Sequence, residues 1–138
     1  MRRTVALLVF GVLAIGAAPA HAATLTSVKF RAPVLTTKWA LDSGDCAGAL
    51  ALSGRRAVDD YGFFTGWTVV WGGADCLATS NSRTLGKRNG VYRLQGRALA
   101  PGTYYVQVRY CHDSDFSGNY FCRASNTLSV RIPRAVKR

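Results

Sequence analysis

The chain has 138 residues, with 18 Lys and Arg residues against 7 acidic residues and a formal net charge of +11. This length is typical of a single domain, and a hydrophobic fraction of 49% excludes an intrinsically disordered chain despite the charge. The acidic residues are all Asp, which leaves few candidates for paired-carboxylate catalysis. No sequence motif in the chain indicates a particular enzymatic reaction.

Residues 1–22 have the three parts of a secretory signal peptide. Arg2 and Arg3 supply positive charge, residues 5–15 form an apolar run, and small residues lead up to Ala22. The apolar run is shorter than the roughly 20 residues that a membrane span needs. We therefore expect cleavage after Ala22 and a secreted mature protein, residues 23–138, without a transmembrane segment.

After residue 22, helical periodicity is nearly absent and alternation of apolar and polar residues recurs instead. This pattern predicts seven short strands, at residues 26–30, 34–41, 47–53, 66–72, 91–94, 103–110 and 126–132. Short strands between turn residues are typical of an all-β domain, so we expect a single seven-stranded antiparallel sandwich over residues 23–133. A basic tail follows at residues 134–138. The expected core includes Trp39, Tyr104, Val106, Val108, Leu128 and Val130.

The run Leu99-Ala-Pro-Gly-Thr-Tyr-Tyr-Val-Gln-Val108, followed later by Leu128-Ser-Val130, resembles the E–F corner and the F and G strands of fibronectin type III domains. The resemblance covers roughly residues 91–132. It implies an immunoglobulin-like sandwich in which Tyr104 packs at the corner and Trp39 is similar to the buried Trp of the family's B strand. The four cysteines and the long stretch from Tyr61 to Arg88 depart from the family's pattern.

Four cysteines in an exported chain predict two disulfides, because the compartment outside the cytosol is oxidising. No C-x-x-C pair is present, which argues against a zinc site or a redox motif. Three pairings are possible, and we expect Cys46–Cys76 together with Cys111–Cys122.

The aspartates fall mainly in loops. If the strands run up and down, the loops at residues 42–46, 73–90 and 111–125 share one end of the sandwich, where such domains often bind ligands. These loops hold a set of candidate binding residues: Asp42, Asp45, Asp75, Asp113 and Asp115. Asp also favours turns whatever the function, so turn chemistry alone explains the same pattern.

Asp113 and Asp115 match the start of a calcium loop, D-x-D-x-S-G, in which alternate oxygens surround a hard cation. The twelfth position is Ala124 rather than a bidentate Glu. We therefore treat calcium as a weak alternative and predict no metal and no other cofactor.

Residues 59–67 are rich in aromatic side chains. Tyr61, Phe63, Phe64 and Trp67 form either an exposed platform for a sugar or a protein partner, or part of the core. The charge suggests another kind of site, with candidate anion-binding residues at Arg83, Lys87, Arg88, Arg134, Lys137 and Arg138. Exposed positive charge favours anionic partners, although it also serves solubility. Export, together with the lack of a known nucleic-acid-recognition motif, disfavours specific binding of nucleic acid.

Catalysis is not expected. His112 is adjacent to Asp113 and close to Ser114, but neighbouring residues on one loop rarely orient one another as a triad. The leading hypothesis is a secreted, non-catalytic binding or structural module that associates with anionic envelope polymers or an extracellular protein. The alternatives are a carrier for a small apolar ligand or a sugar and, with less support, a secreted hydrolase.

Overall fold

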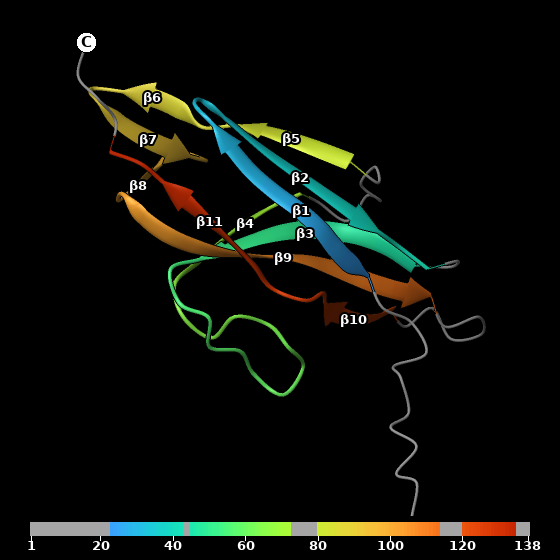
Figure 1. The fold of residues 1–138 in the computed structure, drawn as a ribbon. Helices are drawn as coiled ribbons and strands as arrows, with labels where there is room; N and C mark the ends of the chain where they lie inside the picture. The colour runs from blue at the N-terminus through green and yellow to red at the C-terminus, as the bar shows by residue number, and fades with distance from the viewer. Residues whose placement is uncertain (1–22, 43–44, 73–79, 114–119, 135–138) are drawn as a thin grey trace, which may run out of the picture.

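The computed structural model describes residues 23–42, 45–72, 80–113 and 120–134 (Figure 1). These residues form an all-β structure with no helix. The expected signal peptide lies outside the described residues, as do Asp75, Cys76, Asp115 and the end of the basic tail. The described strands are β1 (Thr24–Arg31), β2 (Val34–Ala40), β3 (Asp45–Ser53), β4 (Thr68–Trp71), β5 (Ser80–Thr84), β6 (Gly86–Arg88), β7 (Val91–Leu94), β8 (Arg97–Leu99), β9 (Gly102–Asp113), β10 (Tyr120–Ala124) and β11 (Leu128–Ile132).

The strands form three antiparallel sheets. The first sheet has the order β1-β2-β5, and the small third sheet has the order β6-β7-β8. In the second sheet β4, β3 and β9 lie side by side, and the long strand β9 pairs on its other edge first with β11 and then with β10. Ser125 continues this ladder between β10 and β11, because its backbone N–H donates to the Val108 carbonyl at 2.8 Å. Its hydroxyl accepts from the Val108 N–H at 2.9 Å.

The prediction of seven strands is wrong in number, because the described residues contain eleven. All seven predicted segments contain a strand, and the additional ones are β5, β6, β8 and β10. The sequences Ser80–Thr84 and Gly86–Arg88 contain no apolar residue, so no alternation marks them as strands. They are extended because β2 and β7 supply hydrogen-bonding partners, a tertiary effect that periodicity does not report.

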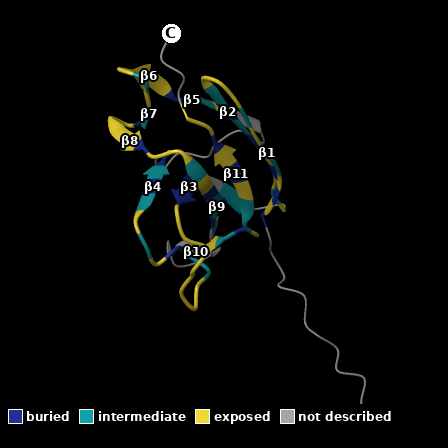
Figure 2. Ribbon diagram, turned by 60° about the vertical axis from the view of Figure 1, so that its left-hand side comes forward, coloured by how far each residue is buried: buried dark blue, intermediate teal, exposed yellow. Residues whose placement is uncertain are grey.

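One hydrophobic core joins all three sheets. Leu50 and Leu52 of β3 meet Val106 and Val108 of β9, and these side chains pack with Trp39 of the first sheet. Tyr92, Leu94 and Leu99 of the third sheet belong to the same cluster. Of the core residues expected from the sequence, Trp39, Tyr104, Val106, Val108 and Val130 are buried, and Leu128 packs against them while partly exposed. Figure 2 shows the alternation of buried and exposed residues along the strands.

Two side chains connect separate elements through backbone hydrogen bonds. Asn126 binds the edge of β1, because its Oδ1 accepts from the Leu25 N–H at 2.7 Å and its Nδ2 donates to the Leu25 carbonyl at 3.0 Å. The Tyr104 hydroxyl donates to the Ala100 carbonyl at 2.7 Å and so ties the start of β9 to the turn that precedes it. Both contacts give hydrogen-bonding partners to backbone groups at or next to the end of a strand.

The outer face of the second sheet is covered by the connection between β3 and β4. Residues 54–67, which we call the β3–β4 loop, fold back over this face and appear in Figure 1 as the long green segment. Gln107 points to this face, and its Nε2 donates to the Gly62 carbonyl at 2.8 Å and to Thr127 Oγ1 at 3.0 Å. A polar residue in the middle of β9 is therefore buried under the loop rather than exposed to solvent.

Candidate functional site

Eight of the fourteen described basic residues gather at one end of the molecule. The turn between β1 and β2, the third sheet and the end of β11 lie together there (Figure 1). The Leu85 N–H donates to the Pro33 carbonyl at 2.7 Å, which joins the β5–β6 connection to the β1–β2 turn. Arg134 lines a hollow together with Val91 of the third sheet, which places the end of β11 against β7. We call this end of the molecule the cationic end.

The cationic end holds basic residues from distant parts of the sequence. Its exposed members are Arg31, Lys87, Arg88, Arg97, Arg131 and Arg134, and Arg83 and Arg93 are half-buried beside them. The described acidic residues lie elsewhere, at the start of β3, the end of β9 and the tip of the β3–β4 loop. Like charges that are collected at one end, without nearby acids, create a positive potential that attracts anions over several ångströms.

The structure brings together four of the six predicted anion-binding residues, Arg83, Lys87, Arg88 and Arg134. Lys137 and Arg138 lie outside the described residues. Sequence reasoning missed Arg31, Arg93 and Arg97, which join the same end only through the fold; Arg131 was noted with the C-terminal basic residues. The sequence did contain one signal for this grouping, since residues 81–112 include several basic residues and no acidic residue.

A hollow of about 200 Å³ lies within the cationic end. Its lining is mainly apolar and includes Tyr92, Leu99, Pro101 and Pro133, with Arg134 at its border. Pockets for small-molecule ligands usually have volumes of roughly 300–1,000 Å³. The hollow is therefore small for a carried ligand.

The opposite end contains the aspartates that the sequence analysis assigned to a binding loop. Asp45 of β3 pairs in register with His112 of β9, and the Asp45 N–H donates to the Asp42 carbonyl at 3.1 Å. The loop after β2 thus does lie beside the end of β9. Asp75, Asp115 and the side chain of Asp113 are outside the described residues, as is the side chain of His112. Within the described part of the chain, no three potential metal ligands are grouped.

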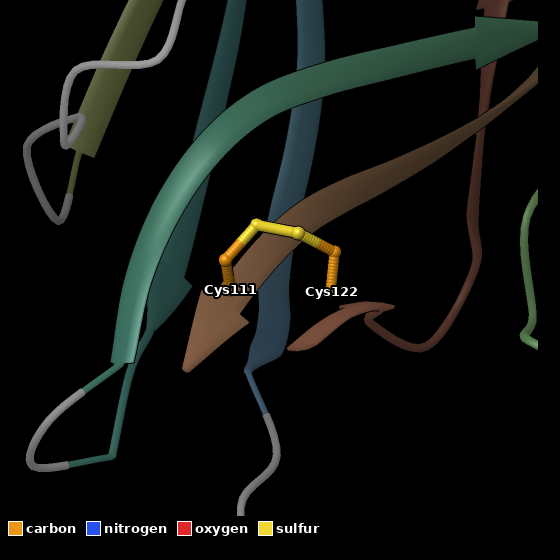
Figure 3. Close-up of a disulfide and its surroundings, with 2 residues drawn as sticks. All are labelled: Cys111 and Cys122. Carbon is orange, nitrogen blue, oxygen red and sulfur yellow. A yellow bond between two sulfur atoms is a disulfide. The ribbon is translucent and has the colours of Figure 1, made fainter. Parts of the chain in front are cut away.

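The predicted Cys111–Cys122 disulfide is confirmed, with an S–S distance of 2.05 Å (Figure 3). The two cysteines lie directly opposite each other on β9 and β10. Cys46 lies opposite Cys111 on its other side, on β3, so three cysteines form one row across the sheet. Cys46 is disulfide-bonded as well, and Cys76, its predicted partner, is outside the described residues. No described cysteine is free.

Two buried tyrosines, Tyr104 and Tyr110, make the free energy of unfolding depend on pH in the alkaline range. Burial raises the pKa of Tyr104 above its ordinary value. Burial also raises the pKa of Tyr110, with a further contribution from the nearby carboxylates of Asp45 and Asp42, which oppose a second negative charge. The folded state therefore holds these two phenolic protons to a higher pH than the unfolded state does.

Stability is consequently expected to fall as the pH rises from about 10 through the raised pKa values, because the unfolded tyrosines ionise first. Unfolding free energies measured by urea titration between about pH 8 and pH 11 test this expectation. Tyr110→Phe should reduce the steepness of the decline. An unchanged pH dependence in that variant would contradict the assignment to Tyr110.

The aromatic residues of the β3–β4 loop are divided between core and surface. Phe64 is buried, Phe63 is half-buried, and Tyr61 and Trp67 are exposed. The Arg109 guanidinium lies 5.0 Å from the Phe63 ring centroid, and the Arg123 guanidinium lies 5.5 Å from that of Tyr61. The structure therefore places Phe64 in the interior and leaves Tyr61 and Trp67 exposed, while binding by the exposed residues stays a prediction.

Hydrogen bonds give the loop a defined shape. Asp59 Oδ1 accepts from the N–H groups of Tyr61 and Phe63, each at 2.9 Å, so this carboxylate organises the tip. The Asp59 N–H donates to the Phe63 carbonyl at 2.8 Å, and the Thr65 N–H donates to the Ala57 carbonyl at 3.1 Å. The loop is therefore a small hairpin with two hydrogen-bonded arms.

Searches against models of known protein families, curated proteins and solved structures find no match to this chain. The described part of the chain has no helix long and apolar enough to cross a membrane.

Proposed function

We propose that the chain is an exported, non-catalytic binding module of immunoglobulin-like architecture whose cationic end holds anionic polymers of the cell envelope. One observation carries this proposal: basic residues from β1, the third sheet and β11 meet at one end, with no described acid among them. A polymer with repeated phosphate or carboxylate groups complements such a surface, because several weak ion pairs act together.

Export is supported by the signal-peptide pattern of residues 1–22 and by disulfide bonding. The signal-peptide pattern predicts cleavage after Ala22, and β1 begins at Thr24 with Ala23 already only 3% exposed. Disulfide bonding also favours an oxidising compartment, since cytosolic proteins rarely keep such bonds.

The immunoglobulin-like architecture rests on local features. The hydrogen bond from the Tyr104 hydroxyl to Ala100 is that of a tyrosine corner, a hallmark of such sandwiches. Trp39 is buried on the second strand, as the resemblance to fibronectin type III domains implies. We further propose that Cys46 pairs with Cys76, which gives the domain two disulfides.

The test is co-sedimentation of the mature protein, residues 23–138, with an insoluble anionic polysaccharide, calcium polygalacturonate. Reversing two exposed charges of the third sheet, in Arg88→Glu/Arg97→Glu, is expected to weaken binding about tenfold at low salt, since several ion pairs worth up to about 1 kcal/mol each are lost. Binding by the wild-type protein should also weaken as the salt concentration rises.

The matched control is Lys38→Glu/Arg56→Glu, which makes the same change in net charge at exposed positions outside the cationic end. This variant should keep most of the binding. Equal losses in the two variants would mean that net charge, rather than the cationic end, causes the binding. No sedimentation of the wild-type protein at low salt would refute the proposed function itself.

A further inference from the structure

The exposed large hydrophobic side chains are concentrated on the β3–β4 loop. Among the described residues four such side chains are exposed, and three of them belong to this loop: Val58 at 46%, Tyr61 at 62% and Trp67 at 49%. An aromatic ring that stays in water forgoes the stabilisation that burial would give it, about 25 cal/mol per Å² of apolar surface. Two such rings on one short loop are therefore unexpected in a segment whose only task is to connect β3 to β4.

The loop holds its backbone in one conformation. Besides the hydrogen bonds within its two arms, it is attached at three points: Phe64 is buried, Gln107 Nε2 donates to the Gly62 carbonyl, and Ser53 Oγ donates to the Trp67 carbonyl at 2.9 Å. The backbone that carries the exposed rings is thus ordered before any ligand binds. Such preorganisation lowers the entropic cost of binding.

Charged groups are interleaved with the aromatic ones. The Arg123 guanidinium stacks on Tyr61, and Asp60, next in the chain, is exposed. A sugar ring has an apolar face of C–H groups and a rim of hydroxyl groups that donate and accept hydrogen bonds. An aromatic ring flanked by a guanidinium and a carboxylate complements both parts.

A protein partner fits less well. Stable protein interfaces bury about 800 Å² on each side around a closely packed apolar centre. The exposed apolar residues here are separated along the loop by Asp59, Asp60 and Thr65, and so lack such a centre.

We propose that the β3–β4 loop is a carbohydrate-binding surface, on which Tyr61 and Trp67 each stack against a ring of a polysaccharide chain while Arg123 and Asp60 hydrogen-bond to its hydroxyl groups. Tyr61 lies at the tip of the hairpin and Trp67 at its base. They are six residues apart in the sequence, and the buried Phe64 lies between them. This separation suits an extended chain of sugars rather than a single ring.

This site is independent of the cationic end, and salt distinguishes the two. Stacking and hydrogen bonding to neutral groups are screened little by salt, whereas exposed ion pairs are screened strongly. The experiment is sedimentation of residues 23–138 with insoluble chitin, cellulose and peptidoglycan in about 1 M NaCl, where the Debye length is near 3 Å. We expect the protein to bind at least one of the three polysaccharides under these conditions.

Two variants locate the binding on the loop. Tyr61→Ala and Trp67→Ala are each expected to weaken binding about tenfold, whereas Tyr61→Phe and Trp67→Phe should keep most of it because the ring face remains. Val91→Ala removes an exposed apolar side chain at the other end of the molecule and should have no effect. Near-ultraviolet circular dichroism verifies that each variant is folded.

Fluorescence provides a second measurement. Of the three tryptophans, Trp39 and Trp71 are buried and Trp67 is exposed, so a soluble fragment of the bound polysaccharide should shift the emission of Trp67. The shift should disappear in Trp67→Phe. Failure of the wild-type protein to bind all three polysaccharides in high salt would overturn the proposal, as would unchanged binding by both alanine variants. Neither result would count against the proposed binding at the cationic end, because that binding is tested at low salt.

Discussion

Replacing Cys111 and Cys122 together by serine is expected to lower the free energy of unfolding by about 3 kcal/mol, since the disulfide closes a short loop in the unfolded chain. The sequence separation of the two cysteines is 11 residues, and the strands that carry them stay paired in the fold without the covalent bond. The effect should therefore appear in the unfolding equilibrium and leave the folded structure largely unchanged. Urea unfolding of both proteins, each fitted with its own slope against denaturant concentration, measures it.

The double variant is necessary because Cys46 lies opposite Cys111. A single Cys122→Ser change would leave a Cys111 thiol beside the disulfide of Cys46, and a thiolate in that position can exchange with the neighbouring bond. Mass spectrometry of peptides from Cys122→Ser should accordingly detect some Cys46–Cys111 linkage. If the double variant loses less than about 1 kcal/mol, the unfolded chain already holds this loop closed by other means.

Leu52→Ala should destabilise the fold by about 3–5 kcal/mol, because it creates a cavity at the centre of the second sheet. Leu52 has no exposed surface and pairs in register with Val69 on one side and Val106 on the other. Neighbours held on three hydrogen-bonded strands have little freedom to collapse into the space. Thermal and denaturant unfolding of the purified variant measure the loss.

Leu128→Ala is the matched control for Leu52→Ala. It removes the same atoms from a side chain that packs against the core while partly exposed. Its cost should be roughly half or less, because fewer contacts are lost and water can reach the site. Similar losses in the two variants would contradict a core centred on β3 and β9.

The proposed binding surfaces differ in how they depend on the fold. The cationic end is assembled from strands far apart in sequence, so a variant that loosens the core should weaken binding there. The β3–β4 loop carries its exposed rings on one continuous segment, but Gln107 and the arginines of β9 and β10 support it. The two surfaces share no residue, so each can be removed by substitutions that leave the other intact.

The sequence by itself determined what depends on local order. Strands such as β9 and β2 alternate apolar and polar residues, and that alternation follows directly from burial of one face of a strand. The Cys111–Cys122 bond was predictable because the two residues flank a short connection. The Pro-Gly turn before Tyr104 likewise marked the start of β9. In each case the interacting groups lie within about a dozen residues of one another.

Only the tertiary structure decided the rest, because the partners are distant in the chain. The polar strand β5 is extended because β2 binds it, and Gln107 is buried because a loop more than 40 residues earlier folds over it. The division of the aromatic segment into buried Phe64 and exposed Tyr61 depends on that same docking. The gathering of Arg31, Arg97 and Arg131 at one end arises from the packing of three sheets on one core, and no local pattern of charges contains it.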